Sequence, residues 1–333
     1  MFTALADGIR RVNRAPAILA GVWLLTLLVS LPLALGLRGM LAEHLGSSLE
    51  ADTALSGVNY DWWQEFTDQA TGLGTTFKPT IIGFGAVLDN LSAFIDNERR
   101  PVVIVGAATA YIILWIFLAG GIIDRYARDR TTRAHGFFSA CGVYFFRFLR
   151  LAVVGWLAYA FLFRYVHAWL FDRLYVDMIR DVNVERTAFV ARVVLYLVFG
   201  ILLAACNLIL DYAKVRAVVE DRRSMLGALR AGVRFIGRNY ASAVSLYVAD
   251  VLLFGVVVSI YAAVAPGATA GGWTMWAALA IGQFYVIGRL WVKLVFWASE
   301  TALFQARLAH ASYVARPVPV WPDSPAAEAI MRT

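Results

Sequence analysis

The stretch "ALRAGVRFIGRNYASAVSLYVADVLLFGVVVSIYAAV" (228–264) contains the two patterns that decide the fold. In its first part, Arg230, Arg234 and Arg238 recur every four residues, while apolar residues occupy another face of the same helical period. Its second part, residues 240–264, is apolar and exceeds the roughly 20 residues that a helix needs to cross a bilayer. The stretch therefore predicts a basic amphipathic helix at a membrane surface that leads directly into a transmembrane span.

Apolar runs of this length occur six times in the 333 residues. The chain is 60% apolar and 16% charged, whereas soluble domains are about half apolar and a quarter charged. We therefore predict an all-α integral membrane protein with one membrane domain, residues 1–310. The first run is too long for the apolar core of a signal peptide, so we expect it to be retained as an anchor. The six predicted spans are about 17–37, 102–123, 148–170, 188–210, 240–264 and 273–299.

The basic residues predict the orientation of these spans, because Lys and Arg accumulate on the cytoplasmic side. With both termini in the cytoplasm, the cytoplasmic segments contain 18 Lys and Arg residues and the outer segments contain 7. The largest outer segment is then 38–101, and residues 311–333 form a Pro-rich cytoplasmic tail. Within the outer segment, residues 76–95 contain Lys78 and Asp89, so we predict an interfacial helix there instead of a seventh span.

The basic helix has a near copy at the start of the chain. "ALADGIRRVNRAPA" (4–17) aligns with residues 228–241, and Gly8, Arg10 and Arg14 coincide with Gly232, Arg234 and Arg238. A weaker third copy, residues 139–152, precedes the third span. We therefore predict three hairpins of two spans, each preceded by a cytoplasmic amphipathic interfacial helix. The alternative is that basic helices in front of inward-starting spans converge on similar composition.

The run "LDYAKVRAVVEDRRSMLGALRAGVRFIGRNYASAVSLY" (210–247) resembles a family pattern. It is similar to uncharacterised bacterial multi-pass proteins related to the membrane domain of glycerophosphodiester phosphodiesterases. The resemblance implies alternating interfacial helices and membrane hairpins, and with the topology it implies the bacterial cytoplasmic (inner) membrane. It does not imply catalysis, because the chain has no His-Arg-Gly start and no metal-binding acidic set around one.

Ionisable residues inside spans are costly and are therefore candidate functional residues. Asp250 in the fifth span and Arg289 in the sixth each lie ten residues from the predicted inner helix end, or roughly 15 Å deep. We therefore predict an Asp250–Arg289 pair. It either fixes the helix register or lines a solute or proton path with Gln283 and Lys293. Asn207 is expected to bond across helices.

The basic segments predict contacts with anionic headgroups of the cytoplasmic leaflet, where each arginine contributes on the order of 1 kcal/mol. A specific headgroup site or a docking surface for a soluble partner is the alternative. The residues expected to make these contacts are Arg10, Arg14, Arg147, Arg150, Arg230, Arg234 and Arg238.

The outer segment contains an aromatic and acidic motif, "NYDWWQEFTDQ" (59–69). Trp62 and Trp63 are expected at the outer headgroups, where indole rings are enriched. Asp61 and Glu65 alternatively offer carboxylates to a cation. A protein partner at this segment or at the C-terminal tail is a further alternative.

The sequence offers no catalytic set. Cys141 and Cys206 lack metal-site spacing, no nucleophile–base pair or phosphate loop is recognisable, and no nucleic-acid motif occurs. We therefore expect a non-enzymatic membrane component without a cofactor or metal, which interacts with lipids or serves as a scaffold. The alternative is a transporter or channel for a small solute that uses the polar residues of spans five and six. A lipid-modifying membrane enzyme that uses the outer acidic residues ranks third.

Overall fold

The computed structural model describes residues 2–48, 53, 59–129, 131–267 and 272–310. Within these residues the secondary structure is helical throughout, without strands. Six helical segments are long and apolar enough to cross a membrane. The prediction of an all-helical protein with six candidate membrane spans is thereby confirmed. The predicted C-terminal tail, 311–333, lies outside the described residues.

The helices vary widely in length. The long element that starts at Ala134 is continuous to Ile179, because two π-helical stretches join α7 to α8. The elements are α1 (Phe2–Asn13), α2 (Pro16–Ser47), α4 (Tyr60–Gln69), the short 3₁₀ helix η1 (Gly74–Thr76), α5 (Gly83–Ile95), α6 (Val102–Arg128), α7 (Ala134–Phe161), the π-helical η2 (Leu162–His167) and η3 (Trp169–Leu174), α8 (Tyr175–Ile179), α9 (Glu185–Val219), α10 (Met225–Arg238), α11 (Tyr240–Val264) and α12 (Trp273–His310).

The ends of several helices differ from the predicted spans. The fifth span coincides with α11, but α2 continues past residue 37 to Ser47 and α12 continues past residue 299 to His310. The α12 extension, "ETALFQARLAH" (300–310), is rich in strong helix formers and contains no Pro or Gly to stop the helix. Apolar length therefore locates a membrane crossing but does not locate the end of its helix.

The first two copies of the basic segment form separate helices, and the third does not. Pro16 begins α2 directly after α1, and the Ser224 side chain accepts a hydrogen bond from the Gly227 amide at the start of α10. Residues 139–152 instead lie within α7, continuous with the third span. The prediction of a separate third interfacial helix was wrong, because no helix-breaking residue separates this segment from the apolar run.

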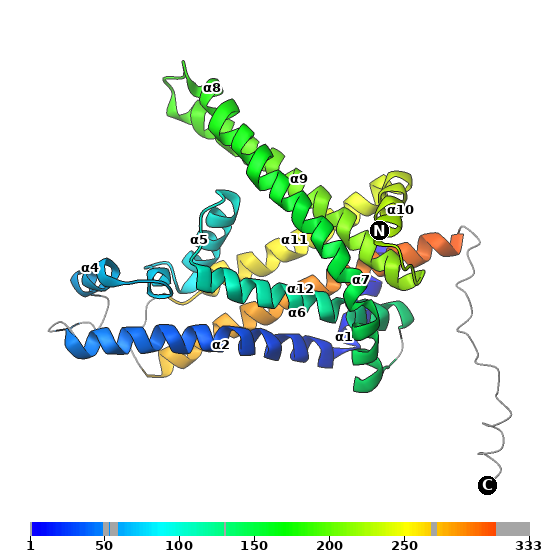
Figure 1. Ribbon diagram of the computed structural model, residues 1–333, viewed down its shortest axis with the longest axis horizontal. Helices are drawn as coiled ribbons and strands as arrows, with labels where there is room; N and C mark the ends of the chain where they lie inside the picture. Colours follow the sequence, from blue (N-terminus) through cyan, green and yellow to red (C-terminus); the bar gives the residue numbers. More distant parts are fainter. Residues whose placement is uncertain (1, 49–52, 54–58, 130, 268–271, 311–333) are drawn as a thin grey trace, which may run out of the picture.

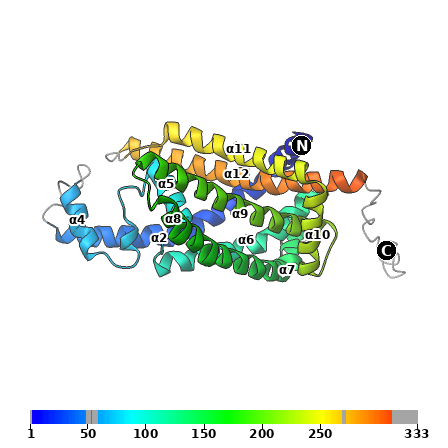
Figure 2. The same ribbon diagram turned by 90° about the horizontal axis from the view of Figure 1, so that it is seen from above.

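Figure 1 shows how the long helices are arranged. α2, α6, α11 and α12 run broadly along the long axis of the molecule (Figures 1 and 2). The element 134–179 and α9 form an arm whose far end, around α8, leaves the other spans at an angle. α1, α10 and the end of α12 lie at the same end of the molecule, which we call the α1 end.

Each basic segment packs on a span that is not the one it leads into. α10 makes its most extensive contact with α9, the start of α7 packs on α6, and α1 packs on α12. Small residues allow these close approaches: a Cβ added at Gly8 would lie 2.7 Å from the Ser299 amide nitrogen. α1, the first helix that the structure describes, therefore packs directly on α12, the last one.

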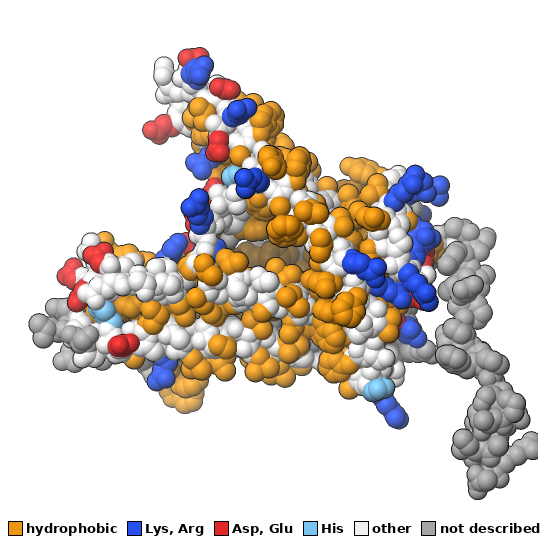
Figure 3. All heavy atoms as spheres, in the orientation of Figure 1, with side chains coloured by type: hydrophobic (Ala, Val, Ile, Leu, Met, Phe, Trp, Pro, Cys, Tyr) orange, Lys and Arg blue, Asp and Glu red, His pale blue; other side chains and the backbone are white. Residues whose placement is uncertain are grey.

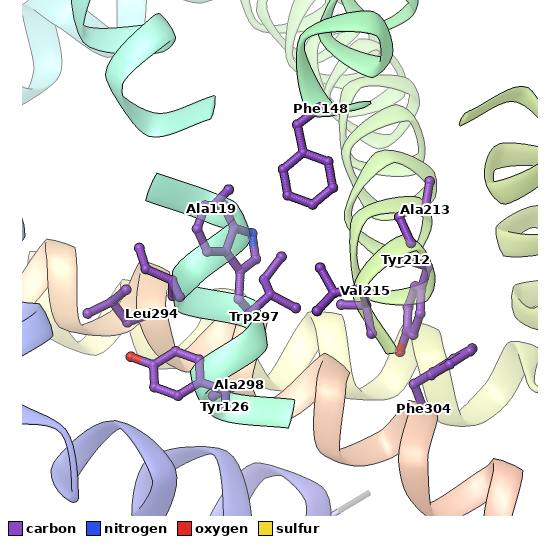
Figure 4. Close-up of a cluster of buried hydrophobic side chains, with 14 of the residues drawn as sticks. Ala119, Tyr126, Phe148, Tyr212, Ala213, Val215, Leu294, Trp297, Ala298 and Phe304 are labelled. Carbon is purple, nitrogen blue, oxygen red and sulfur yellow. The ribbon is translucent and has the colours of Figure 1, made fainter. Parts of the chain in front are cut away.

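The core is formed where α6, α9 and α12 meet at the α1 end (Figure 4). Tyr126, Tyr212 and Phe304 are almost completely buried there. The ring centre of Phe235 in α10 lies 5.0 Å from that of Tyr212 and 4.8 Å from that of Phe304. This core fixes the near ends of the helices, while the arm diverges farther away.

Candidate functional site

A cavity of about 830 Å³ lies where the arm diverges from α6, α11 and α12. Figure 3 shows the surface hollowed between the arm and the helices beneath it. Most of the cavity wall is aromatic or aliphatic, and Phe94 of α5 contributes at the rim. The aromatic wall residues from the long helices are Tyr111, Trp115, Phe148, Trp156, Tyr159, Phe163, Tyr247, Phe254, Phe296 and Trp297.

Asp211 of α9 organises the polar part of the cavity. Its Oδ1 accepts hydrogen bonds from Lys214 Nζ at 2.7 Å and from Trp297 Nε1 at 3.2 Å. Its Oδ2 accepts from Asn207 Nδ2 at 3.0 Å, so both oxygens of this buried carboxylate are engaged. Asn207 also approaches the Tyr247 hydroxyl at 3.4 Å, which confirms its predicted contact with another helix.

Three cationic side chains line the same cavity. Lys293 Nζ lies 3.5 Å from the centre of the Trp115 ring, and Lys214 Nζ lies 5.3 Å from the centre of the Trp297 ring. The aromatic faces attract these ammonium groups through cation–π interactions. Arg289 lies one helical turn before Lys293 and also lines the cavity. Among the described residues, no carboxylate lies within ion-pair distance of Arg289 or Lys293.

The predicted Asp250–Arg289 pair is absent. Asp250 is completely buried, and its Oδ2 accepts a hydrogen bond from Ser299 Oγ at 2.8 Å. The prediction placed the inner end of the last span at residue 299, whereas α12 continues to His310. Counting about ten residues back from that end reaches Ser299, roughly 15 Å along the helix. The depth argument was sound, but the assumed helix end gave Asp250 the wrong partner.

The other polar residues of α12 are dispersed. Gln283 accepts a hydrogen bond from Trp23 Nε1 at 3.0 Å and joins α12 to α2, away from the cavity. Glu300 is also buried outside the cavity, and neither of its carboxylate oxygens has a hydrogen-bond partner among the described residues. The structure therefore brings Asn207, Arg289 and Lys293 together and leaves Asp250 and Gln283 elsewhere.

The predicted headgroup arginines fall into two groups. At least three are held by carboxylates of the chain: Arg10 by Asp7 at 3.9 Å, Arg14 by Asp129 at 3.4 Å, and Arg147 by Asp221 at 2.6 Å. Arg150 donates to the Phe146 carbonyl at 3.1 Å and is exposed. Arg230, Arg234 and Arg238 are also exposed, and no ion pair to a described carboxylate forms there.

α10 packs on the protein through a face of small and aromatic residues. Ala228, Gly232 and Phe235 face the protein, whereas the apolar residues Leu226 and Val233 are 69% and 48% exposed. Small residues therefore make the helix contact, and the larger apolar residues remain available to lipid.

The aromatic motif of the outer segment is only partly exposed. Trp62 is buried beside His44, with ring centres 5.8 Å apart, so the prediction that it lies among headgroups was wrong. Trp63 Nε1 donates to the Phe77 carbonyl at 3.1 Å. Asp61 and Glu65 are exposed, and in the described part of the chain no group of three or more potential metal ligands forms.

A polar cluster holds α5 against the arm and so positions Phe94 at the cavity rim. A ring nitrogen of His167 hydrogen-bonds with the Ile95 carbonyl at 2.9 Å, and Asp96 accepts from Tyr196 and from Ser92. Partial burial alone would raise the pKa of Asp96. The hydrogen bonds from Tyr196 and Ser92 and the positive charge of Arg192 outweigh it and lower the pKa below its ordinary value.

The polar part of the cavity also contains residues that the sequence analysis did not select. Asp211 and Lys214 follow the predicted end of the fourth span at residue 210 and were counted as cytoplasmic. The absence of Pro or Gly between residues 210 and 219 was the available signal that α9 continues.

Comparisons of the chain with protein-family models, with curated proteins and with solved structures found no match. The resemblance carried by residues 210–247 therefore stays a prediction.

Proposed function

We propose that this integral membrane protein binds an anionic lipid in the cavity between the arm and α6, α11 and α12. The phosphate of the headgroup contacts Lys214, Lys293 and Arg289, and the acyl chains follow the aromatic wall. The observation that carries this proposal is the composition of the cavity: three cations and one carboxylate in an otherwise mostly apolar wall.

The charge balance favours an anionic ligand over a neutral one. Asp211 is already engaged by Lys214, Trp297 and Asn207, so it does not neutralise Lys293 or Arg289. A cation held away from water without a counter-ion is unfavourable, and a bound phosphate removes that cost. Apolar walls with a few polar groups at fixed positions are typical of ligand pockets.

The basic residues at the α1 end support an orientation of the protein in the membrane. We infer that the α1 end faces the cytoplasm of a bacterium, with both termini on that side of the inner membrane, because Lys and Arg are enriched there. Arg150 and the α10 arginines then lie near the anionic leaflet. In this proposal the protein is a lipid-binding or scaffold component and not an enzyme.

The transport alternative has less support. It requires Asp250, Gln283, Arg289 and Lys293 to line one path, and only Arg289 and Lys293 share the cavity. Asp250 is enclosed by protein and hydrogen-bonded to Ser299.

Retention of phosphatidylglycerol tests the proposal. The protein is equilibrated with equal amounts of phosphatidylglycerol and phosphatidylcholine, and the lipid retained after detergent washing is measured by native mass spectrometry. We expect the wild type to retain phosphatidylglycerol preferentially and the Arg289→Met/Lys293→Met variant to lose that preference.

Arg164→Met is the matched control, because Arg164 is exposed on the outer part of the arm and does not line the cavity. It is expected to retain the lipid as the wild type does, and elution profiles and melting temperatures verify that each variant folds. Equal retention of phosphatidylglycerol by the double variant and the wild type would contradict the proposal.

A further inference from the structure

A second hollow of about 610 Å³ lies at the α1 end, between the end of α9, α10 and the end of α12. Figure 3 shows Lys and Arg side chains gathered at this end of the molecule. Six arginines line the hollow, which we call the arginine groove: Arg216, Arg222, Arg230, Arg234, Arg238 and Arg307. They come from α9, α10, α12 and the turn between α9 and α10, so the groove is a property of the fold and not of one helix.

Three of these arginines are held by hydrogen bonds within the protein. Arg216 donates to the Ala231 carbonyl at 2.9 Å and to Glu220 at 2.8 Å. Arg222 donates to the same Glu220 oxygen at 2.5 Å. Arg307 on α12 donates to the Ser242 hydroxyl at 2.7 Å. These contacts fix the position of guanidinium groups before any ligand arrives, which lowers the entropic cost of binding.

The remaining three arginines lie on α10. Arg230, Arg234 and Arg238 follow each other by one helical turn and are exposed. Glu220 is the one carboxylate paired with a groove arginine in the described residues, so six positive charges less one negative leave a surplus of five. Like charges on neighbouring turns repel each other, and a bound anion relieves that repulsion.

We propose that the arginine groove binds a ligand with two neighbouring phosphate groups. Guanidinium groups bind phosphate through paired hydrogen bonds, and a surplus of five charges exceeds what one phosphate group neutralises. Phe235, Phe304 and Leu308 give the groove an apolar side that accepts a non-polar part of the ligand. This inference is independent of the lipid cavity, because the two sites share no lining residue.

The two phosphate groups have two chemical sources. One is the headgroup of cardiolipin, which reaches the groove from the lipid beside the exposed Leu226 and Val233. The other is a soluble diphosphate from the aqueous side. The chemistry of recognition is the same in both cases, so the test includes one probe for each.

The experiment uses the full chain in phosphatidylcholine nanodiscs. Binding of inorganic pyrophosphate is measured by calorimetry, and retention of added cardiolipin is measured by native mass spectrometry. We expect Arg234→Gln/Arg238→Gln to weaken binding of the effective probe by about tenfold or more, because charge-assisted hydrogen bonds are lost.

The sequence repeat supplies a matched control. Arg10→Gln/Arg14→Gln removes the same two charges from the equivalent positions of α1, which do not line the groove. This variant is expected to change binding by less than about twofold, since only long-range electrostatic attraction is reduced. Melting temperatures of both double variants verify that each variant is folded.

The outcomes separate the sources and can overturn the proposal. Pyrophosphate binding that added cardiolipin does not inhibit supports a soluble diphosphate, and cardiolipin retention without pyrophosphate binding supports the lipid. Binding of neither probe overturns the proposal. It is also overturned if the α1 variant loses as much affinity as the groove variant, because binding would then depend only on total surface charge.

Discussion

α1 and α10 have closely similar sequences but different roles in the structure. Gly8 and Gly232 occupy the same aligned position, and each faces another helix. The alignment also places Arg11 opposite Phe235. Arg11 donates to the Tyr126 carbonyl at 2.7 Å and to Gln305 at 2.8 Å, whereas Phe235 packs on Tyr212 and Phe304.

This difference shows that one sequence pattern can serve two purposes. α1 directs its polar contacts inward and joins α6 and α12, so its charges are largely satisfied within the chain. α10 packs through small and aromatic residues and leaves its arginine row exposed to solvent or ligand. The basic pattern alone therefore does not distinguish a structural helix from a binding helix, but the contacts do.

Substitution of the aligned glycines is expected to give the largest difference in stability between α1 and α10. A Cβ at Gly8 would lie within 2.8 Å of the Ser299 backbone, whereas a Cβ at Gly232 would lie 3.3 Å from the Ala213 nitrogen. We expect Gly8→Ala to destabilise the fold by about 2–3 kcal/mol through overpacking. Gly232→Ala should change stability by less than about 1 kcal/mol, because the gain in helix propensity offsets a milder contact. Reversible unfolding in mixed micelles measures both.

A larger loss for Gly232→Ala than for Gly8→Ala would show that α10, and not α1, is the more tightly packed of the two. Gly237→Ala provides a reference for helix propensity alone, because nothing lies within 4 Å of a Cβ at that position.

Arg11 tests whether the inward polar contacts of α1 stabilise the molecule. Arg11→Met removes its hydrogen bonds to Asp7, Tyr126 and Gln305 and is expected to cost about 2 kcal/mol. The same unfolding measurement applies. Lys78→Met, in an exposed ion pair with Asp89 at 3.5 Å, is the control and should have little effect. If Arg11→Met lost no more stability than Lys78→Met, the conclusion that Arg11 anchors α1 would be contradicted.

Substitution of the exposed arginines should have the smallest effect on stability, and the effect should have opposite signs for α1 and α10. Arg14→Gln breaks the ion pair with Asp129 and should destabilise the protein by less than about 1 kcal/mol. Arg234→Gln relieves repulsion in the arginine row and should be neutral or stabilising by a few tenths of a kcal/mol. Both effects should shrink as salt is raised, and a salt titration of the unfolding midpoint detects this.

The parts of the fold that depend on local patterns were predictable from the sequence. Apolar length located all six spans, because a bilayer crossing requires a minimum number of apolar residues. The ends of α2, α9 and α12 were not predictable in this way, since good helix formers continue each helix beyond its apolar run. That error assigned Asp250 to Arg289 and placed Asp211 in a cytoplasmic segment instead of in the fourth long helix.

The candidate site depends on tertiary geometry that local patterns do not encode. Lys293, Arg289 and Asn207 were recognisable as polar residues in apolar spans. The cavity that joins them exists because the arm diverges from the other helices, and Trp115 and Trp297 contact the lysines from different helices. The repeat was likewise visible in the sequence, but nothing in it identified α12 as the partner of α1.

The packing of α1 on α12 has a consequence for biogenesis. α1 is synthesised long before α12, which packs on its Gly8 face. α1 therefore lacks this neighbour while the spans between them are inserted. The close contact between Gly8 and Ser299 can therefore form only after α12 has been synthesised.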